Sequence, residues 1–387
     1  MSLERIYLDY NATAPLLPAA RAAMIAAMEA SGNPSSIHAE GRAARHLVEQ
    51  ARASVAELMG AGTRAITFTS GGTEAANLVL TPSLTDGGAP LTQLFLCAGE
   101  HACVLQGHRF PEAQTRLVPL LPTGIIDLAA LAAMLAEAAG ARVLLALQAA
   151  NNETGVIQPV AEASELVHRA GGLVVCDAVQ AAGRLDLRGL GADALFISGH
   201  KIGGPKGVGA LAFVNDRLHI SHPLVRGGGQ ERGLRAGTEN VAAIAGFGAA
   251  AKAALAGQAE EMARLAGLRD ALEAQVMRLV PDAVIFGQGA ARLAQTSALA
   301  ARGASAETLL IVLDLAGFAV SSGSACSSGK VQSSHVLRAM SVEPELAKGA
   351  LRISLGRGTT SHQIEAFCEA LDKAVRNIRA RSVKSAA

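Results

Sequence analysis

Short apolar runs alternate with helical patterns through the first two thirds of the chain. The runs are rich in Leu, Val, Ile and Phe and lie at 66–69, 94–97, 143–147, 173–176 and 195–197. Helical stretches, at about 127–139 and 159–170, separate several of them. Alternation of this kind predicts an α/β fold with a mostly parallel sheet and helices on both of its faces.

A polar cluster follows each of these predicted strands. The clusters are Ser70–Glu74, Glu100–His101, Asn151–Gly155, Asp177–Gln180 and His200–Lys201. In open α/β sheets, ligands bind outside the carboxyl ends of the strands. We therefore expect all five clusters to meet at one edge of the sheet.

The rest of the chain predicts a smaller α+β part. Helices are expected at about 18–30 and before Met59, and a long alanine-rich helical region is broken by Pro281. Later strands are expected at 296–300, 319–321 and 351–354, and the basic tail from Arg376 is expected to fray. We predict a large domain over residues 15–257 and a small domain formed by residues 1–14 and 258–387.

Length, charge and cysteine content narrow the classes of function. Half of the 387 residues are hydrophobic, and the formal net charge of +1 argues against nucleic acid or a membrane as partner. The sequence contains no run of about 18 apolar residues, so no membrane-spanning helix is predicted, and its first residues lack a signal-peptide pattern. Five cysteines without a Cys-x-x-Cys pair argue against a disulfide framework or a metal site and favour a reducing, cytoplasmic location.

Lys201 stands where the predicted strand 195–197 meets a loop rich in glycine and proline. An amine held at a strand end stays within bonding reach of a carbonyl and can form a Schiff base. The alternative is a basic hairpin loop in which Lys201 and Lys206 are both solvated.

Three other positions each allow a functional and a structural interpretation. The turn Ser70-Gly-Gly-Thr73 exposes N–H groups that can bind an anion, or it is an ordinary turn in which Thr73 caps a helix. Asp177 needs a cationic partner such as a protonated ring nitrogen if it is to stay ionised, or it caps a helix or pairs with an arginine. His101 stacks on a flat ligand or shuttles protons, or it is a structural histidine.

Cys326 differs from the core-like cysteines. It lies among Ser and Gly residues, away from any strand or helix pattern, whereas Cys97 and Cys176 have apolar neighbours. We interpret Cys326 as an exposed nucleophile, and we expect residues 327–333 to be among the least ordered of the chain.

A phosphate site, a carboxylate for a ring nitrogen and a Schiff-base lysine at one sheet edge are typical of pyridoxal 5'-phosphate enzymes. The chain resembles the NifS/IscS-type cysteine desulfurases, which are class V aminotransferase-like enzymes. Nine motifs, from one end of the chain nearly to the other, carry the resemblance: Tyr7–Thr13, Thr69–Glu74, Glu100–His101, Asn151–Gly155, Asp177–Gln180, Ser198–Lys201, Arg232–Thr238, Ser322–Cys326 and Leu351–Gly356. The resemblance implies an aminotransferase-like fold of type I.

The resemblance also implies a role for each site residue. Around the cofactor ring, Lys201 would form the Schiff base, Asp177 would pair with the ring nitrogen, Gln180 would bond the ring hydroxyl and His101 would stack on the ring. The phosphate would be bound by Gly72, Thr73, Ser198 and His200, with Thr238 reaching in from the other subunit of a homodimer. The substrate carboxylate would be held by Asn152 and Arg352.

In such an enzyme Cys326 would take the sulfur of L-cysteine as a persulfide while L-alanine leaves, and would pass it to an acceptor such as an iron–sulfur scaffold protein. Two departures bear on acceptor docking: Lys330–Ser334 replaces an expected Leu-Glu-Pro-Ser, and Gly203 stands where an aromatic is common. A selenocysteine lyase or a class V aminotransferase would share the cofactor site. The aminotransferase would have no use for Cys326, and a non-enzymatic scaffold would not need Lys201 and Asp177 together.

Overall fold

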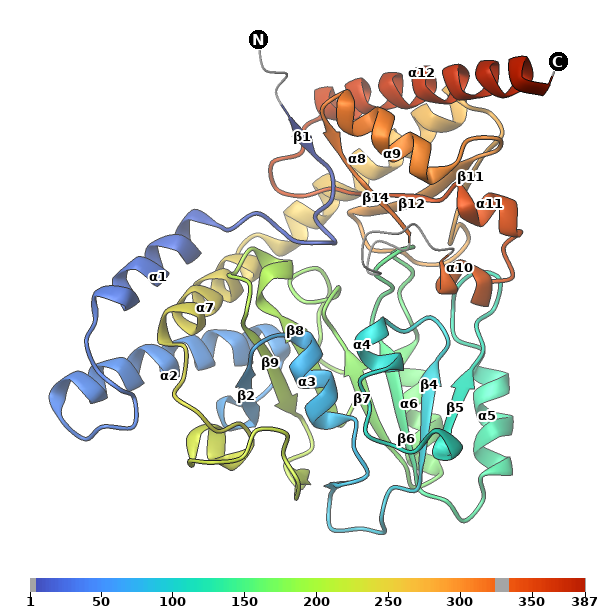
Figure 1. The fold of residues 1–387 in the computed structure, drawn as a ribbon. Coiled ribbons are helices and arrows are strands. Elements are labelled where there is room, and N and C mark those ends of the chain that lie inside the picture. The colour runs from blue at the N-terminus through green and yellow to red at the C-terminus, as the bar shows by residue number, and fades with distance from the viewer. Residues whose placement is uncertain (1–4, 324–333, 387) are drawn as a thin grey trace.

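A seven-stranded sheet forms the centre of the larger part of the molecule (Figure 1). The computed structural model describes residues 5–323 and 334–386, with side chains to residue 381. The strands follow the spatial order β2 Ile66–Thr69, β9 Gly209–Phe213, β8 Ala194–Ser198, β7 Leu173–Asp177, β6 Val143–Gln148, β4 Gln93–Cys97 and β5 Thr115–Val118. All are parallel except β9, which runs antiparallel to both neighbours. The predicted, mostly parallel sheet is confirmed.

Helices cover both faces of this sheet, because successive side chains of each strand point to opposite sides. Within β6, Val143, Leu145 and Leu147 join one core, whereas Leu144 and Ala146 join the other. The first core is closed by α2 Ala39–Met59, α5 Leu128–Glu137, α6 Val160–Arg169 and α7 Val241–Leu255, and the second by α3 Gly72–Val79 and α4 Ala102–Leu105. Helix α1 Pro18–Glu29 packs on α7.

A second, four-stranded antiparallel sheet lies at the top of Figure 1. Its order is β11 Ala283–Ile285, β12 Thr296–Ala301, β15 Leu351–Ser354 and β14 Ser321–Ser322. Helices α8 Gln258–Leu279, α9 Ala306–Leu315 and α12 Ser361–Ala386 pack around a separate core that includes Leu8. The remaining short elements are β1 Ile6–Tyr7 paired with β13 Phe318–Ala319, β3 Leu84–Thr85 paired with β10 His219–Ile220, and the helices α10 His335–Ala339 and α11 Pro344–Lys348.

Two sequence predictions about the C-terminal part are wrong. The single strand expected at 319–321 is two strands with different partners, because β13 pairs with β1 and β14 pairs with β15. The tail from Arg376 does not fray but continues α12 to Ala386.

The alanine-rich helical region is divided where α7 ends and α8 begins. The two helices meet at 74°, and Gly257 between them has a φ of 68°, which glycine adopts without strain. Helix α7 packs on α1 and α2, whereas α8 packs on β11, β12 and α12. The domain boundary placed at residues 257 and 258 stays a prediction. In the described part of the chain, no single helix is long and apolar enough to span a membrane, and only the bent pair α7–α8 together meets that length and composition.

Candidate active site

A cavity of about 370 Å³ opens at the carboxyl edge of the main sheet. Its walls include ten residues that the sequence assigned to the site: Gly72, Thr73, His101, Asn152, Asp177, Gln180, Ser198, His200, Lys201 and Arg352. Nine of them lie at or beyond the carboxyl ends of β2, β4, β6, β7 or β8, and Arg352 comes from β15 of the second sheet. The polar clusters therefore converge as expected, although the individual roles stay predictions.

Two other predicted site residues are not part of this wall. Thr238 is exposed on the loop before α7 and does not line the cavity of its own chain. Cys326, with the segment 327–333 that was expected to be poorly ordered, lies outside the described residues.

Lys201 is held inside the site rather than solvated. It lies in a single turn of 3-10 helix, Gly199–Ile202, directly after β8. Its Nζ donates hydrogen bonds to the carbonyl oxygens of Asn11 at 2.6 Å and Ala12 at 2.9 Å. Lys206, in the same loop, is exposed. This contrast favours the Schiff-base interpretation over a loop with two solvated lysines.

Asp177 is the last residue of β7, and its carboxylate lines the cavity. Its Oδ1 accepts a hydrogen bond from the backbone N–H of Val179 at 2.9 Å, so it caps a turn and not a helix. Among the described residues, no arginine forms an ion pair with it. Burial raises the pKa of the Asp177 carboxyl to about 6, and the Lys201 ammonium opposes that rise only in part. A cation bound in the cavity would therefore stabilise the ionised carboxylate.

Replacing Asp177 by Asn should damage function and yet stabilise the cofactor-free protein. Burial raises the pKa of the Asp177 carboxyl in the folded protein above its value in the unfolded chain, so the proton that the folded state binds stabilises the fold below about pH 4, and this stabilisation is lost as the pH rises through 6. Asn should remove that loss while it still accepts the Val179 hydrogen bond. Chemical denaturation of both cofactor-free proteins from pH 4 to 8 measures the difference.

Turnover of Asp177→Asn should fall by roughly 10- to 1,000-fold, because contact between opposite charges shifts the pKa of a partner by about 1–3 units. Near-parental turnover would contradict the placement of a charged Asp177 against the cofactor ring. Equal stability of the two cofactor-free proteins at pH 8 would contradict the raised pKa of the Asp177 carboxyl.

His101 makes a structural hydrogen bond and also lines the cavity, so the structure agrees with both interpretations of this residue. It precedes α4, and its Nδ1 accepts a hydrogen bond from the backbone N–H of Cys103 at 3.1 Å. Burial, together with the positive charge of Lys201, lowers the pKa of His101 to about 4. The imidazole is therefore neutral near pH 7 and carries its proton on Nε2, which suits a ring that stacks on a flat ligand.

The opposite end of the cavity is built for an anion. Gly72 and Thr73 lie in the first turn of α3, where backbone N–H groups have no partner within the helix. The alternative role of Thr73 as helix cap is wrong, because Gly71 occupies the capping position. A Cβ atom at Gly72 would lie only 3.1 Å from Val179 Cγ2 and would narrow the cavity. The Ser198 and His200 side chains complete this end.

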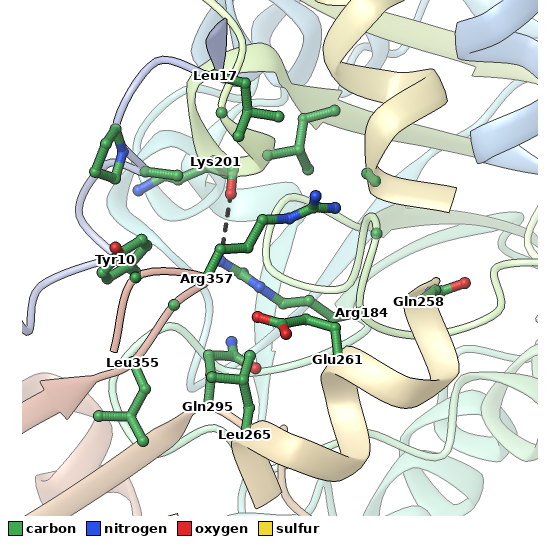
Figure 2. A pocket seen from close by; sticks show the side chains of 18 of the residues that line it. Tyr10, Leu17, Arg184, Lys201, Gln258, Glu261, Leu265, Gln295, Leu355 and Arg357 are labelled. Carbon is green, nitrogen blue, oxygen red and sulfur yellow. Dashed lines mark hydrogen bonds between the residues drawn. The ribbon is translucent and has the colours of Figure 1, made fainter. Parts of the chain in front are cut away.

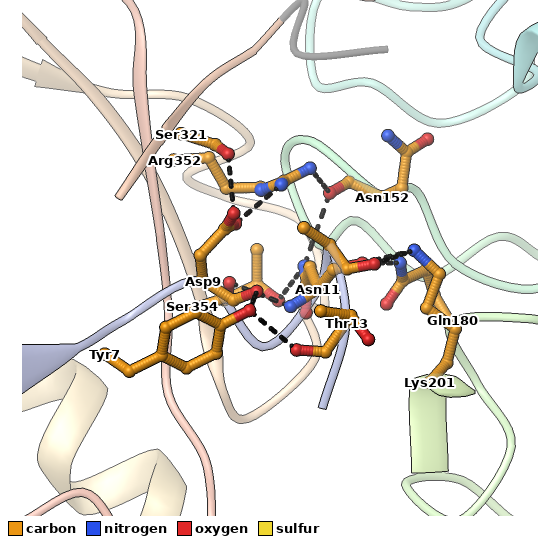
Figure 3. Close-up of polar contacts among 12 residues, drawn as sticks. Tyr7, Asp9, Asn11, Thr13, Asn152, Gln180, Lys201, Ser321, Arg352 and Ser354 are labelled. Carbon is orange, nitrogen blue, oxygen red and sulfur yellow. Dashed lines mark hydrogen bonds and ion pairs between the residues drawn. The ribbon is translucent and has the colours of Figure 1, made fainter. Parts of the chain in front are cut away.

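Arg352 is fixed by Asp9 and by the backbone of Asn152 (Figure 3). Its Nη2 lies 2.8 Å from Asp9 Oδ1, and its Nη1 donates to the Asn152 carbonyl oxygen at 3.1 Å. The second Asp9 oxygen accepts a hydrogen bond from Ser321 at 2.8 Å. The Arg352 Nε is buried without a partner among the described residues. The Arg352 side chain lines the cavity, and an oriented guanidinium suits a carboxylate ligand.

Sequence reasoning missed three groups at this site. Asp9 orients Arg352, Asn11 and Ala12 supply the carbonyl oxygens for Lys201, and Cys103 places a second cysteine in the cavity wall. The segment Tyr7–Thr13 carried the family resemblance but received no role. The polar residues Asp9 and Asn11, which come soon after the apolar stretch Ile6–Leu8, were the available signal.

These residues match the functional groups of pyridoxal phosphate. The anion end suits the phosphate, the buried Asp177 carboxylate suits a protonated ring nitrogen, and Lys201 is an amine for the aldehyde. Fold and site together define the class of a pyridoxal phosphate-dependent enzyme.

Comparison with known proteins gives the family. Residues 6–367 match the aminotransferase class-V family. A cysteine desulfurase of Cereibacter sphaeroides is 43% identical over 98% of both chains, and an IscS-like cysteine desulfurase of Mycobacterium tuberculosis is 38% identical over 98% of both. The crystal structure of a NifS-like protein from Rickettsia africae superposes with a TM-score of 0.86 at 35% identity, covering 96% of this chain and 99% of that one. The chain belongs to the aminotransferase class-V family and, within it, to the NifS/IscS-type cysteine desulfurases, with the predicted aminotransferase-like fold.

Proposed function

We propose that the enzyme converts L-cysteine to L-alanine and retains the sulfur on Cys326. The Cβ–S bond of the substrate breaks, its electron pair stays on carbon and is protonated, and the sulfur forms an S–S bond to Cys326. Cysteine and a thiol thus become alanine and a persulfide, with no external oxidant or reductant. The observation that carries the proposal is the placement of Lys201, Asp177 and Arg352 around one cavity.

Each side chain of the cavity has a task that its geometry supports. Bound pyridoxal phosphate supplies an electron sink for the bonds at the substrate's α-carbon. Lys201 lies where it can hold the cofactor and move a proton at Nζ. Asp177 keeps the ring nitrogen protonated, and His101 offers a neutral ring with its proton on Nε2. Arg352 binds the substrate carboxylate through the N–H groups that Asp9 and Asn152 leave open.

The partner subunit of a homodimer would complete the phosphate site. The loop that carries Thr238 is anchored by Glu231, which accepts hydrogen bonds from Arg52 Nη1 and from the backbone N–H of Phe68 at 2.8 and 2.9 Å. Glu231 and Arg232 have positive φ values of 46° and 57°, a strained conformation that the buried contacts hold in place. A loop fixed in this way presents Thr238 outward, toward a second copy. Light scattering should give twice the chain mass.

A sulfur-acceptor protein is the expected second partner, in the cytoplasm. The relatives with IscS-like names and the long segment between Cys326 and Arg352 favour iron–sulfur cluster assembly as the destination of the sulfur.

The direct test mixes the yellow holoenzyme with L-cysteine and measures alanine and sulfide with and without a reductant. Alanine should form in equal amounts to protein-bound sulfur when the reductant is absent, and sulfide should appear catalytically when it is present. L-Selenocysteine in a parallel reaction separates a desulfurase from a selenocysteine lyase. Transamination of L-cysteine to a keto acid, with no alanine, would overturn the proposal.

A further inference from the structure

Lys201 also lines a second cavity, of about 250 Å³ (Figure 2). Most of its wall is apolar, with Leu17, Ile202 and Leu265 among the contributors. The Arg184 guanidinium projects into this space (Figure 2). No proposed step of the reaction uses Arg184, so a cation at this position calls for an explanation.

The Arg184 guanidinium donates hydrogen bonds to two residues of the cofactor site, Gln180 and Lys201. Its Nη1 donates to the Gln180 backbone oxygen at 2.8 Å and to Gln180 Oε1 at 2.6 Å, and its Nη2 donates to the Lys201 carbonyl oxygen at 3.3 Å. Among the described residues, no carboxylate lies within ion-pair distance of it. Burial lowers the pKa of Arg184 to about 10, so it remains a cation near neutral pH.

Two hydrogen bonds, one at Oε1 and one at Nε2, fix the direction in which the Gln180 amide points. An amide has one oxygen that accepts and one NH₂ group that donates two hydrogen bonds. Because Arg184 can only donate, the Gln180 oxygen must face it, and the NH₂ group then lies on the side of the cofactor cavity. One of its N–H groups donates to the Asn11 carbonyl oxygen at 3.0 Å. The second is left for a ligand in the cavity, whose wall Gln180 forms.

We propose that Arg184 is a positioning residue that locks the Gln180 amide with its NH₂ group toward the cofactor. The inference rests on the proposed function, in which Gln180 donates to the ring oxygen of pyridoxal phosphate. An amide rotated by half a turn would place its own oxygen against that electron-rich oxygen and lose the hydrogen bond. Arg184 also donates a hydrogen bond to the backbone carbonyl of Lys201. One guanidinium therefore contacts both Gln180, the donor to the ring oxygen, and Lys201, the Schiff-base residue, so the two move together.

A double-mutant cycle on cofactor affinity tests the proposal without reference to catalysis. Cofactor-free parent, Arg184→Met, Gln180→Ala and the double variant are titrated with pyridoxal phosphate, and the visible absorption maximum of each holoenzyme is recorded. Arg184→Met should weaken binding about tenfold and shift the absorption maximum as Gln180→Ala does, because both lose one hydrogen bond to a charged oxygen. In the Gln180→Ala background, Arg184→Met should change affinity less than about twofold.

Two further variants separate positioning from a general effect on the fold. Arg357→Met removes another arginine of the same cavity, one that donates to the Ala253 carbonyl and not to Gln180, and should leave the affinity and absorption unchanged. Arg184→Lys keeps one donor for the Gln180 oxygen and should therefore have most of the parental affinity for pyridoxal phosphate. This variant also tests the proposal if Arg184→Met does not fold.

The outcomes distinguish this inference from the function on which it rests. If Arg184→Met and Arg184→Lys weaken binding equally in both Gln180 backgrounds, Arg184 does not act through Gln180 and the inference fails, while the role of Gln180 stands. If Gln180→Ala itself leaves affinity and absorption unchanged, the cofactor contact assigned to Gln180 is overturned, and the inference with it.

Discussion

Lys201→Ala should abolish covalent attachment of the cofactor and lower the rate of alanine formation by roughly 10³-fold or more. The loss is this large because one Nζ both carries the cofactor and moves the proton. The fold should survive, since Lys201 is only partly buried and its hydrogen bonds go to the backbone of Asn11 and Ala12. Loss of the visible absorption band of the lysine-bound cofactor, with unchanged circular dichroism, is the expected result.

Lys206→Ala is the matched control for this variant. Lys206 lies five residues later in the same glycine-rich loop, is exposed and does not line the cavity. It should keep both the absorption band and the turnover of the parent. If Lys201→Ala retains the parental band, or if Lys206→Ala loses it, Lys201 is not the residue that binds the cofactor.

Five strands of the main sheet could be predicted from the sequence because nearly all of their residues are buried, whereas the edge strand β5, in which only Val118 is buried, was not predicted. Buried strands appear as continuous apolar runs, and each of the five was found where the sequence placed it, as at 143–147 and 173–176. The position of Asp177 and Lys201 at one edge then followed from parallel strand direction alone. The antiparallel direction of β9 was not predicted, although the connection from β8 is too short for a crossover helix and favours that direction.

Contacts between residues far apart in the chain were beyond the reach of pattern analysis. The Asp9–Arg352 ion pair joins residues 343 positions apart, and the hydrogen bond from Lys201 to Asn11 joins residues 190 apart. The Gln180 amide also donates to the Asn11 carbonyl oxygen, 169 positions away. Local sequence identifies the chemistry of each group, whereas tertiary contacts decide which atom of the group faces the ligand.

Two-residue strands were a second source of error. Ser321–Ser322 and Phe318–Ala319 are too short to show a period of their own, so they read as one strand. Their division matters for the site, because β14 places Ser321 beside Asp9, the residue that orients Arg352.

Cys326→Ala should separate the chemistry of the cofactor from sulfur transfer. The variant should bind pyridoxal phosphate and L-cysteine as the parent does, yet form alanine at least about 10³-fold more slowly, because the substrate sulfur has lost its nucleophile. Three other cysteines cannot replace it. Burial raises the pKa of Cys97, Cys176 and Cys368 far above neutral, so these three remain thiols at pH 7.

Cys103 provides the most stringent control for the assignment of Cys326, since it lines the cofactor cavity and is only partly buried. Cys103→Ala should keep alanine formation, and brief exposure of the parent to L-cysteine should add one sulfur atom to Cys326, as located by mass spectrometry of peptides. A sulfur adduct on Cys103 with Cys326 unmodified would overturn the assignment and make Cys103 the acceptor. The proposed reaction requires that Cys103→Ala still forms the persulfide on Cys326 and that Cys326→Ala forms no persulfide. Only one thiolate can take the sulfur directly from the substrate.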